Sequence, residues 1–106
     1  PTKIRRAVSP ATARDVGNMM VAAVQGGTGT AAQIPGLRVG GKTGTAETGI
    51  NGKNTTWFIA FAGNEGQKPK LAIAVVLQNQ SLTGGATAAP IARQVMQALL
   101  TSTPNP

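Results

Sequence analysis

Apolar residues near the start of the chain follow the spacing of an amphipathic helix. They stand at Val16, Met19, Met20, Ala23 and Val24. Ser9 and Pro10 precede them as a capping hydroxyl and a proline suited to the first helical turn, and Gly26-Gly27 follows as a helix stop. We predict a helix from about residue 10 to residue 26, with its two methionines in the core.

Three runs of strand-forming residues follow, at about 37–46, 55–63 and 70–79. The first is flanked by glycines, the second is rich in β-branched and aromatic residues, and the third is an almost continuous apolar run. Short turns separate them, and Asn51-Gly52 in the first turn is a strong hairpin signal. The short connections predict an antiparallel meander, and the continuous apolar run predicts a third strand buried on both faces.

Apolar residues return to helical spacing near the end of the chain. The core-facing residues are Ile91, Val95, Met96 and Leu99. Thr87 is the expected cap of this helix, and Pro90 is expected in its first turn. We expect residues 101–106 to form a disordered tail.

The predicted order is a helix, three antiparallel strands and a second helix. This is an α/β arrangement of the α+β kind, an antiparallel sheet with helices packed on it. Two helices on one face of the sheet would leave the other face uncovered, whereas the third strand predicts that both faces are covered. We therefore expect a partner for the uncovered face, either the rest of a domain or another chain.

Composition removes several classes of function. The chain has 106 residues, which suits one small domain or a piece of a larger one, and only 12% of them are charged. Cysteine and histidine are absent and only three acidic residues are present, so thiolate or imidazole metal sites and a Ser-His-Asp triad are excluded within the chain. We expect no metal and no cofactor.

Charge and hydropathy argue against nucleic acid and membrane as partners. The formal charge is +7, but the lysines and arginines are scattered, and the only aromatic residues, Trp57, Phe58 and Phe61, share one apolar run. We expect Trp57 and Phe58 to pack in the core rather than to form a base-stacking platform, and Arg38 to be solvated. No apolar run reaches the ~18 residues that a membrane span needs, so we expect no membrane contact by this segment.

The segment GGKTGTAE, from Gly40 to Glu47, carries candidate chemistry and admits two interpretations. From Gly36 to Thr43 the chain matches the phosphate-loop pattern G-x-x-x-x-G-K-[ST]. That loop requires a buried strand before it and a helix after it. Here the preceding residues are few and polar, and the following ones form a turn. Nucleotide binding is a remote alternative.

The second interpretation is the Lys-Thr-Gly strand of penicillin-recognising serine enzymes. Four segments occur in order, GGTGTAA, VGGKTGTAE, TTWFIAFAG and LAIAVVL, between a Ser-Pro-x-Thr-Ala helix and a closing helix. Three residues alone recur by chance, but the ordered set, from about residue 9 to about residue 100, resembles the C-terminal segment of a penicillin-binding protein transpeptidase domain. The resemblance implies a beta-lactamase/transpeptidase-like fold, with residues 1–106 as an incomplete part of one domain.

The resemblance also implies roles for four residues. Lys42 and Thr45 are expected to be catalytic, because the lysine supplies positive charge in the cleft and the N–H of Thr45 corresponds to half of the oxyanion hole. Thr43, Gly44 and Thr45 are expected to bind substrate. Alternation along a strand puts the two threonine hydroxyls on one face, where both can meet one carboxylate, and Gly44 leaves room for a substrate backbone.

The nucleophilic serine of this family belongs to an S-x-x-K motif, with an S-x-N motif elsewhere, and neither motif occurs in this chain. Ser9, Ser81 and Ser102 are its only serines, and none has a lysine three residues on or an asparagine two residues on. We therefore expect the chain to be inactive alone and to have the remainder of the same domain as its partner.

The implied activity is that of a D,D-transpeptidase, which cross-links peptidoglycan stem peptides through an acyl-serine intermediate and binds beta-lactam antibiotics. The resemblance implies a location on the extracytoplasmic side of the bacterial cell membrane, with the parent protein anchored upstream. Three alternatives stay open. A D,D-carboxypeptidase or a serine beta-lactamase passes the acyl group to water, and a non-catalytic penicillin-binding-like module performs no turnover.

Overall fold

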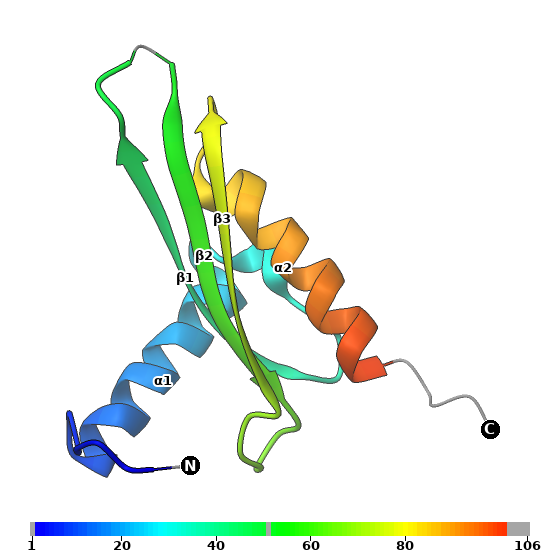
Figure 1. Ribbon diagram of the computed structural model, residues 1–106. Helices are drawn as coiled ribbons and strands as arrows, with labels where there is room; N and C mark the ends of the chain where they lie inside the picture. The colour runs from blue at the N-terminus through cyan, green and yellow to red at the C-terminus, as the bar shows by residue number, and fades with distance from the viewer. Residues whose placement is uncertain (1, 51, 102–106) are drawn as a thin grey trace.

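The computed structural model describes residues 2–50 and 52–101 and confirms an antiparallel sheet with helices packed on it (Figure 1). In chain order the elements are α1 (Pro10–Gly26), the short 3-10 helix η1 (Thr30–Ala32), β1 (Arg38–Glu47), β2 (Asn54–Gly63), β3 (Leu71–Gln80) and α2 (Gly84–Thr101). The predicted turn residue Asn51 and positions 102–106 of the predicted tail lie outside the described residues, and Thr101 is the last residue of α2.

The helix α1 begins where the sequence predicts. The hydroxyl of Ser9 accepts a hydrogen bond from the N–H of Thr12 at 3.1 Å, and Pro10 occupies the first turn, where its missing N–H costs nothing. The prediction that both methionines of α1 fill the core is wrong, because Met19 is 63% exposed whereas Val24 is buried. α1 packs mainly against the edge strand β1, and Met19 lines an open hollow between the helix and the sheet instead of filling the core.

The sheet has the order β1-β2-β3 with both pairs antiparallel, as the short connections predict. Gly44 lies directly opposite Trp57 in this register. β1 has a partner on one side only and is an edge strand of the described sheet. Thr48 closes the turn between β1 and β2, because its hydroxyl donates to the carbonyl of Lys53 at 2.7 Å.

One face of the sheet packs on α2 and forms the core. Phe58 of β2 and Met96 of α2 are fully buried there, as predicted. The other buried apolar residues are Val24, Ala32, Ile34, Val39, Ala60, Ala62, Ala88, Ala89 and Ala92. Small side chains on α2 and β2 let the helix lie close to the sheet. The predicted stripe of Ile91, Val95 and Leu99 is exposed instead, because the alanines and Met96 occupy the buried side of α2.

The opposite face of the sheet is only partly covered by this chain. Gly17 of α1 lies against the ring of Phe61 on this face. The two helices therefore contact opposite faces of the sheet, whereas the sequence predicts both on one face. Further along the same face, Ile59 is 45% exposed and Val76 is 62% exposed. No residue of β3 is fully buried, so the prediction of a third strand buried on both faces is wrong for the described residues.

The helix α2 begins four residues earlier than a cap at Thr87 predicts. Its first residue is Gly84, so Thr87 and Pro90 lie inside the helix rather than at its cap and in its first turn. The carbonyl of Thr83 starts the helix by accepting N–H bonds from Ala86 at 3.1 Å and from Thr87 at 3.0 Å. Neither α1 nor α2, over the residues that the structure describes, is long and apolar enough to cross a membrane.

Candidate functional site

Thr43 and Thr45 lie on the edge strand β1 with their side chains on one face. Alternate residues of a strand point to the same side, and for these two it is the side on which α2 packs. Both border a hollow of about 490 Å³ whose other walls come from the loop after α1 and the first turn of α2. The lining residues are Thr28, Thr43, Thr45, Thr83, Gly85 and Ala86.

The hydroxyl groups of Thr43 and Thr45 each form a hydrogen bond with a neighbouring segment of the chain. The hydroxyl oxygens of Thr43 and Thr28 are 3.0 Å apart, and the N–H of Gly84 donates to the hydroxyl of Thr45 at 3.3 Å. A hydroxyl has one proton to donate and two lone pairs, so Thr45 accepts from Gly84 and keeps its proton for an acceptor in the hollow. The arrangement suits a ligand group that only accepts hydrogen bonds, such as a carboxylate.

Lys42 stands on the opposite side of the strand from the two threonines. It is exposed, and its ammonium group donates to the carbonyl of Thr43 at 2.6 Å. It borders a hollow of about 410 Å³ between α1 and β1, with Met19 and Ile59 among the lining residues. The structure therefore brings the two hydroxyls together and places the ammonium beside the Thr43–Gly44 peptide group, outside the hollow that the hydroxyls line.

Three glycines of β1 each face an aromatic ring of β2. A Cβ added at any of them would overlap the ring. The pairs are Gly40 with Phe61, Gly41 with Phe58 and Gly44 with Trp57. Trp57 thus fills the space over Gly44 on one face of the sheet, so a substrate backbone can reach Gly44 only along the free edge of β1. Phe58 is fully buried in the core as predicted. The prediction that Trp57 packs in the core is wrong, because Trp57 is half-buried on the opposite face of the sheet, outside the core cluster.

Two glycines fix the first turn of α2 against its surroundings. A Cβ at Gly84 would stand 2.6 Å from the carbonyl oxygen of Gly44, and a Cβ at Gly85 would stand 2.5 Å from that of Thr28. Only glycine fits such close backbone approaches. The first turn of α2 is therefore positioned by the motif strand and by the loop after α1.

A buried hydrogen bond ties the same turn to β2. Thr56 is fully buried, and its hydroxyl oxygen lies 2.9 Å from that of Thr87. Thr87 donates its one proton to the carbonyl of Thr83 at 2.8 Å, so Thr56 must be the donor in the pair. Sequence reasoning missed these threonines and Thr28, because residues far apart in the chain give no signal until the packing is known.

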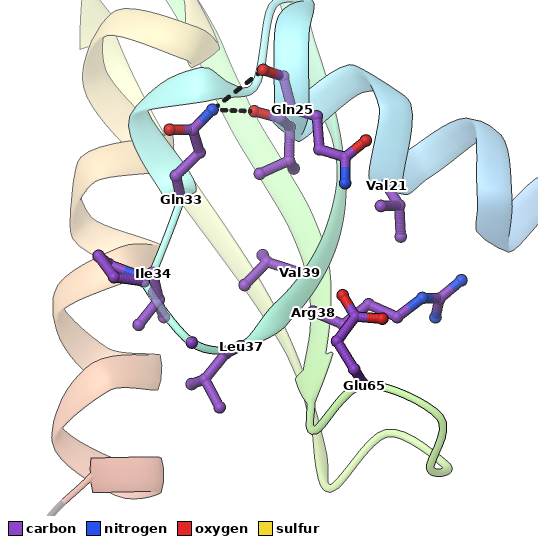
Figure 2. A pocket seen from close by; sticks show the side chains of 11 residues that line it. Val21, Gln25, Gln33, Ile34, Leu37, Arg38, Val39 and Glu65 are labelled. Carbon is purple, nitrogen blue, oxygen red and sulfur yellow. Dashed lines mark hydrogen bonds between the residues drawn. The ribbon is translucent and has the colours of Figure 1, made fainter.

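A further hollow, of about 300 Å³, lies at the other end of β1 (Figure 2). Gln33 donates there from its side-chain amide to the carbonyls of Val24 at 2.9 Å and Gln25 at 3.1 Å, at the C-terminal end of α1. Arg38 is not simply solvated as the sequence predicts, because it donates to the side chain of Asn18 at 2.9 Å and lies over an aromatic ring of β2. These polar groups dock α1 on the sheet.

The geometry rules out the phosphate-loop interpretation. Lys42 and Thr43 lie in the middle of a strand, and the chain continues through a turn into β2, where a phosphate loop requires a helix N-terminus. Within residues 2–50 and 52–101, no three His, Cys, Asp or Glu side chains come together as a metal site.

Comparison with known sequences assigns a family. The profile described as "Penicillin binding protein transpeptidase domain" matches residues 1–97. Peptidoglycan D,D-transpeptidase PbpA of Mycobacterium tuberculosis is 45% identical over 107 residues, which cover 94% of this chain and 21% of that protein. Stage V sporulation protein D of Bacillus subtilis is 34% identical over 105 residues, which cover 92% of this chain and 16% of that protein. The chain spans about a fifth of the length of these relatives.

Solved structures share the fold. The D,D-transpeptidase domain of a peptidoglycan glycosyltransferase from Eggerthella lenta matches with a TM-score of 0.70 and 42% identity, over 94% of this chain and 24% of that one. The transpeptidase domain of the FtsI4 D,D-transpeptidase from Legionella pneumophila matches with a TM-score of 0.67 and 30% identity, over 87% of this chain and 37% of that one. From sequence and fold together, the chain belongs to the penicillin binding protein transpeptidase family.

Proposed function

We propose that this chain provides the Lys-Thr-Gly strand of a peptidoglycan D,D-transpeptidase, with Lys42 and Thr45 as catalytic residues and Thr43, Gly44 and Thr45 as substrate-binding residues. The observation that carries the proposal is that Thr43 and Thr45 share one face of an edge strand and line one hollow. Relatives named as peptidoglycan D,D-transpeptidases support it.

The two hydroxyls bind the C-terminal carboxylate of the donor stem peptide, or the carboxylate of a beta-lactam. Residues two apart on a strand lie about 7 Å from each other. A carboxylate has two oxygens that only accept hydrogen bonds, so one ligand group can take a proton from each hydroxyl. Lys42 adds positive charge at the same strand, and its flexible stem lets the ammonium exchange the Thr43 carbonyl for a ligand anion.

The reaction is an acyl transfer through a serine that lies outside this chain. The serine oxygen attacks the carbonyl of the penultimate D-alanine, the C–N bond to the terminal D-alanine breaks, and the leaving amine takes up the proton that the serine loses. An acceptor amine then attacks the ester, the bond from the carbonyl carbon to the serine oxygen breaks, and the serine oxygen takes up the proton that the amine loses. The N–H of Thr45 donates to the oxyanion that forms in each step. With a beta-lactam, the ring amide opens and the acyl-serine remains.

The nucleophile and its S-x-x-K and S-x-N motifs belong, in this proposal, to the remainder of the same domain. The partly open sheet face supports a partner of this kind, because Ile59 and Val76 are apolar and exposed there. We place the complete protein on the extracytoplasmic side of the bacterial membrane and anchored upstream, since peptidoglycan is cross-linked there.

Acylation of the complete protein by a labelled penicillin tests the proposal. We expect Lys42→Ala to lower the second-order acylation rate about 100-fold or more, the usual effect of removing one stabilising group from such a site. We expect the fold to survive with a thermal midpoint near that of wild type, because Lys42 is exposed in this chain and the proposal places its ammonium group in the cleft of the complete domain. Lys53→Ala makes the same change in the turn between β1 and β2 and keeps the wild-type rate. An undiminished rate in Lys42→Ala refutes the assignment.

Product analysis separates the proposal from its nearest alternatives. With a stem-peptide donor and an amine acceptor, a transpeptidase yields cross-linked peptide and free D-alanine. A D,D-carboxypeptidase yields shortened peptide without cross-links, a beta-lactamase turns over penicillin, and a non-catalytic module transforms neither substrate. Each of these three results contradicts the transpeptidase assignment.

A further inference from the structure

We infer that Thr28 is a positioning residue that orients the Thr43 hydroxyl toward the ligand carboxylate, an inference that rests on the function proposed above. Thr28 lies in the loop between α1 and η1, and its hydroxyl oxygen is 3.0 Å from that of Thr43, 15 residues further along the chain. Both residues line the hollow of about 490 Å³. Thr28 is therefore within reach of the residue that the proposal assigns to substrate binding.

The ligand decides which of the two hydroxyls donates. Either oxygen can be the donor in the pair as it stands. A carboxylate only accepts and Thr43 has a single proton, so Thr43 can hold a carboxylate and keep its bond to Thr28 only if Thr28 is the donor in the pair. Hydrogen bonds in such a chain polarise one another, so the Thr28 donor also strengthens the bond from Thr43 to the ligand.

The loop that carries Thr28 is held on both sides. The N–H groups of Gly27 and Gly29 both donate to the carbonyl of Ala23 at 3.0 Å. The Thr28 carbonyl lies against Gly85, where a Cβ would stand only 2.5 Å away. Because α1 and α2 hold its main chain, bringing the Thr28 hydroxyl against Thr43 costs side-chain entropy but little further main-chain entropy.

Thr28→Val and Thr28→Ser, made in the complete protein, test the inference with penicillin and with the methyl ester of the same penicillin. We expect Thr28→Val to lower the acylation efficiency of the acid about tenfold, mainly through weaker binding before acylation. The ester has no carboxylate to orient, so its rate is the same in wild type and in Thr28→Val. Thr28→Ser keeps the hydroxyl, so its acylation efficiency with the free acid should lie within about twofold of the wild-type value.

The matched control is Thr30→Val, which changes an exposed threonine two residues further along. Equal losses for acid and ester in Thr28→Val, or no recovery in Thr28→Ser, overturn the inference and make Thr28 a purely structural loop residue. A second outcome also overturns the inference: Thr28→Val is acylated by the free acid at the wild-type rate, whereas Thr45→Val is acylated more slowly. This outcome leaves the proposed function standing. A wild-type protein that penicillin does not acylate overturns both together.

Discussion

The indole ring of Trp57 lies over Gly44 and fills the space that a Cβ at this position would need. The two residues are direct partners across β1 and β2. An aromatic ring that covers a glycine on the neighbouring strand offsets the weak strand preference of the glycine. The lack of a side chain at Gly44 is thus a packing requirement of the strand pair, in addition to any role toward a ligand.

Gly44→Ala is expected to destabilise the protein by about 1–3 kcal/mol, the usual range for an overpacked site, because the added methyl group overlaps the Trp57 indole. Thermal unfolding of the complete protein measures the loss. Gly26→Ala is the control, because no atom outside the neighbouring helix backbone lies within 4 Å of a Cβ added at Gly26, and its effect should stay below about 0.5 kcal/mol.

A double variant shows whether Trp57 is the cause of the loss. Trp57→Leu removes the ring, so Gly44→Ala should cost much less in the Trp57→Leu background than in wild type. If the stability loss of the double variant equals the sum of the losses of Gly44→Ala and Trp57→Leu, the ring is not what excludes a side chain at Gly44, and the packing explanation fails.

Local chemistry made the start of α1 predictable, whereas the start of α2 depended on tertiary contacts. Ser9 and Pro10 act on atoms within one helical turn, so the sequence alone locates that start. Gly84 is a poor helix former on its own, which is why the sequence points to Thr87 as the cap. It begins α2 because its missing side chain lets it sit against the backbone of Gly44.

The candidate site was predictable to a similar extent. Alternation along a strand predicts that Thr43 and Thr45 share a face, and the register of β1 agrees. The same alternation puts Lys42 on the other face, which the family resemblance alone does not indicate. Thr28 enters the site through a loop whose path depends on the packing of α1 and α2, and no local pattern in the sequence encodes that path.

Thr56→Val is expected to destabilise the protein by about 1–2 kcal/mol, because it removes the donor of a buried hydrogen bond to Thr87 and keeps the shape of the side chain. Thermal or urea unfolding measures the loss. Thr55→Val is the matched control, since Thr55 is the neighbouring threonine, half-buried on the opposite face. A loss no larger than that of the control would mean that the bond makes no net contribution.

Gln33→Ala is expected to loosen the last turn of α1, because the amide of Gln33 donates to two carbonyls at that helix end. The local cost is about 1 kcal/mol, which hydrogen–deuterium exchange detects as roughly fivefold faster exchange of the amides in this turn. Gln25→Ala, an exposed residue of the same turn, serves as the control. Equal exchange in the two variants contradicts the capping role.

Val76 offers a direct test of what covers the open face of the sheet. It is 62% exposed on β3, on the same face as Ile59. The transpeptidase assignment predicts that the remainder of the domain covers this face in the complete protein. Val76→Lys then places an ammonium group in an apolar contact, where it is unpaired and poorly solvated, and we expect a loss of about 2 kcal/mol or more.

Gln78→Lys is the matched control for this experiment, because Gln78 lies two residues further along the same face and is already polar and exposed. In the complete protein, Val76→Lys should lower the thermal midpoint by about 5 °C or more, whereas Gln78→Lys should leave it unchanged. Equal midpoints in the two variants would mean that Val76 meets water in the complete domain. The apolar face would then not be the surface on which the nucleophile-bearing part of the domain packs.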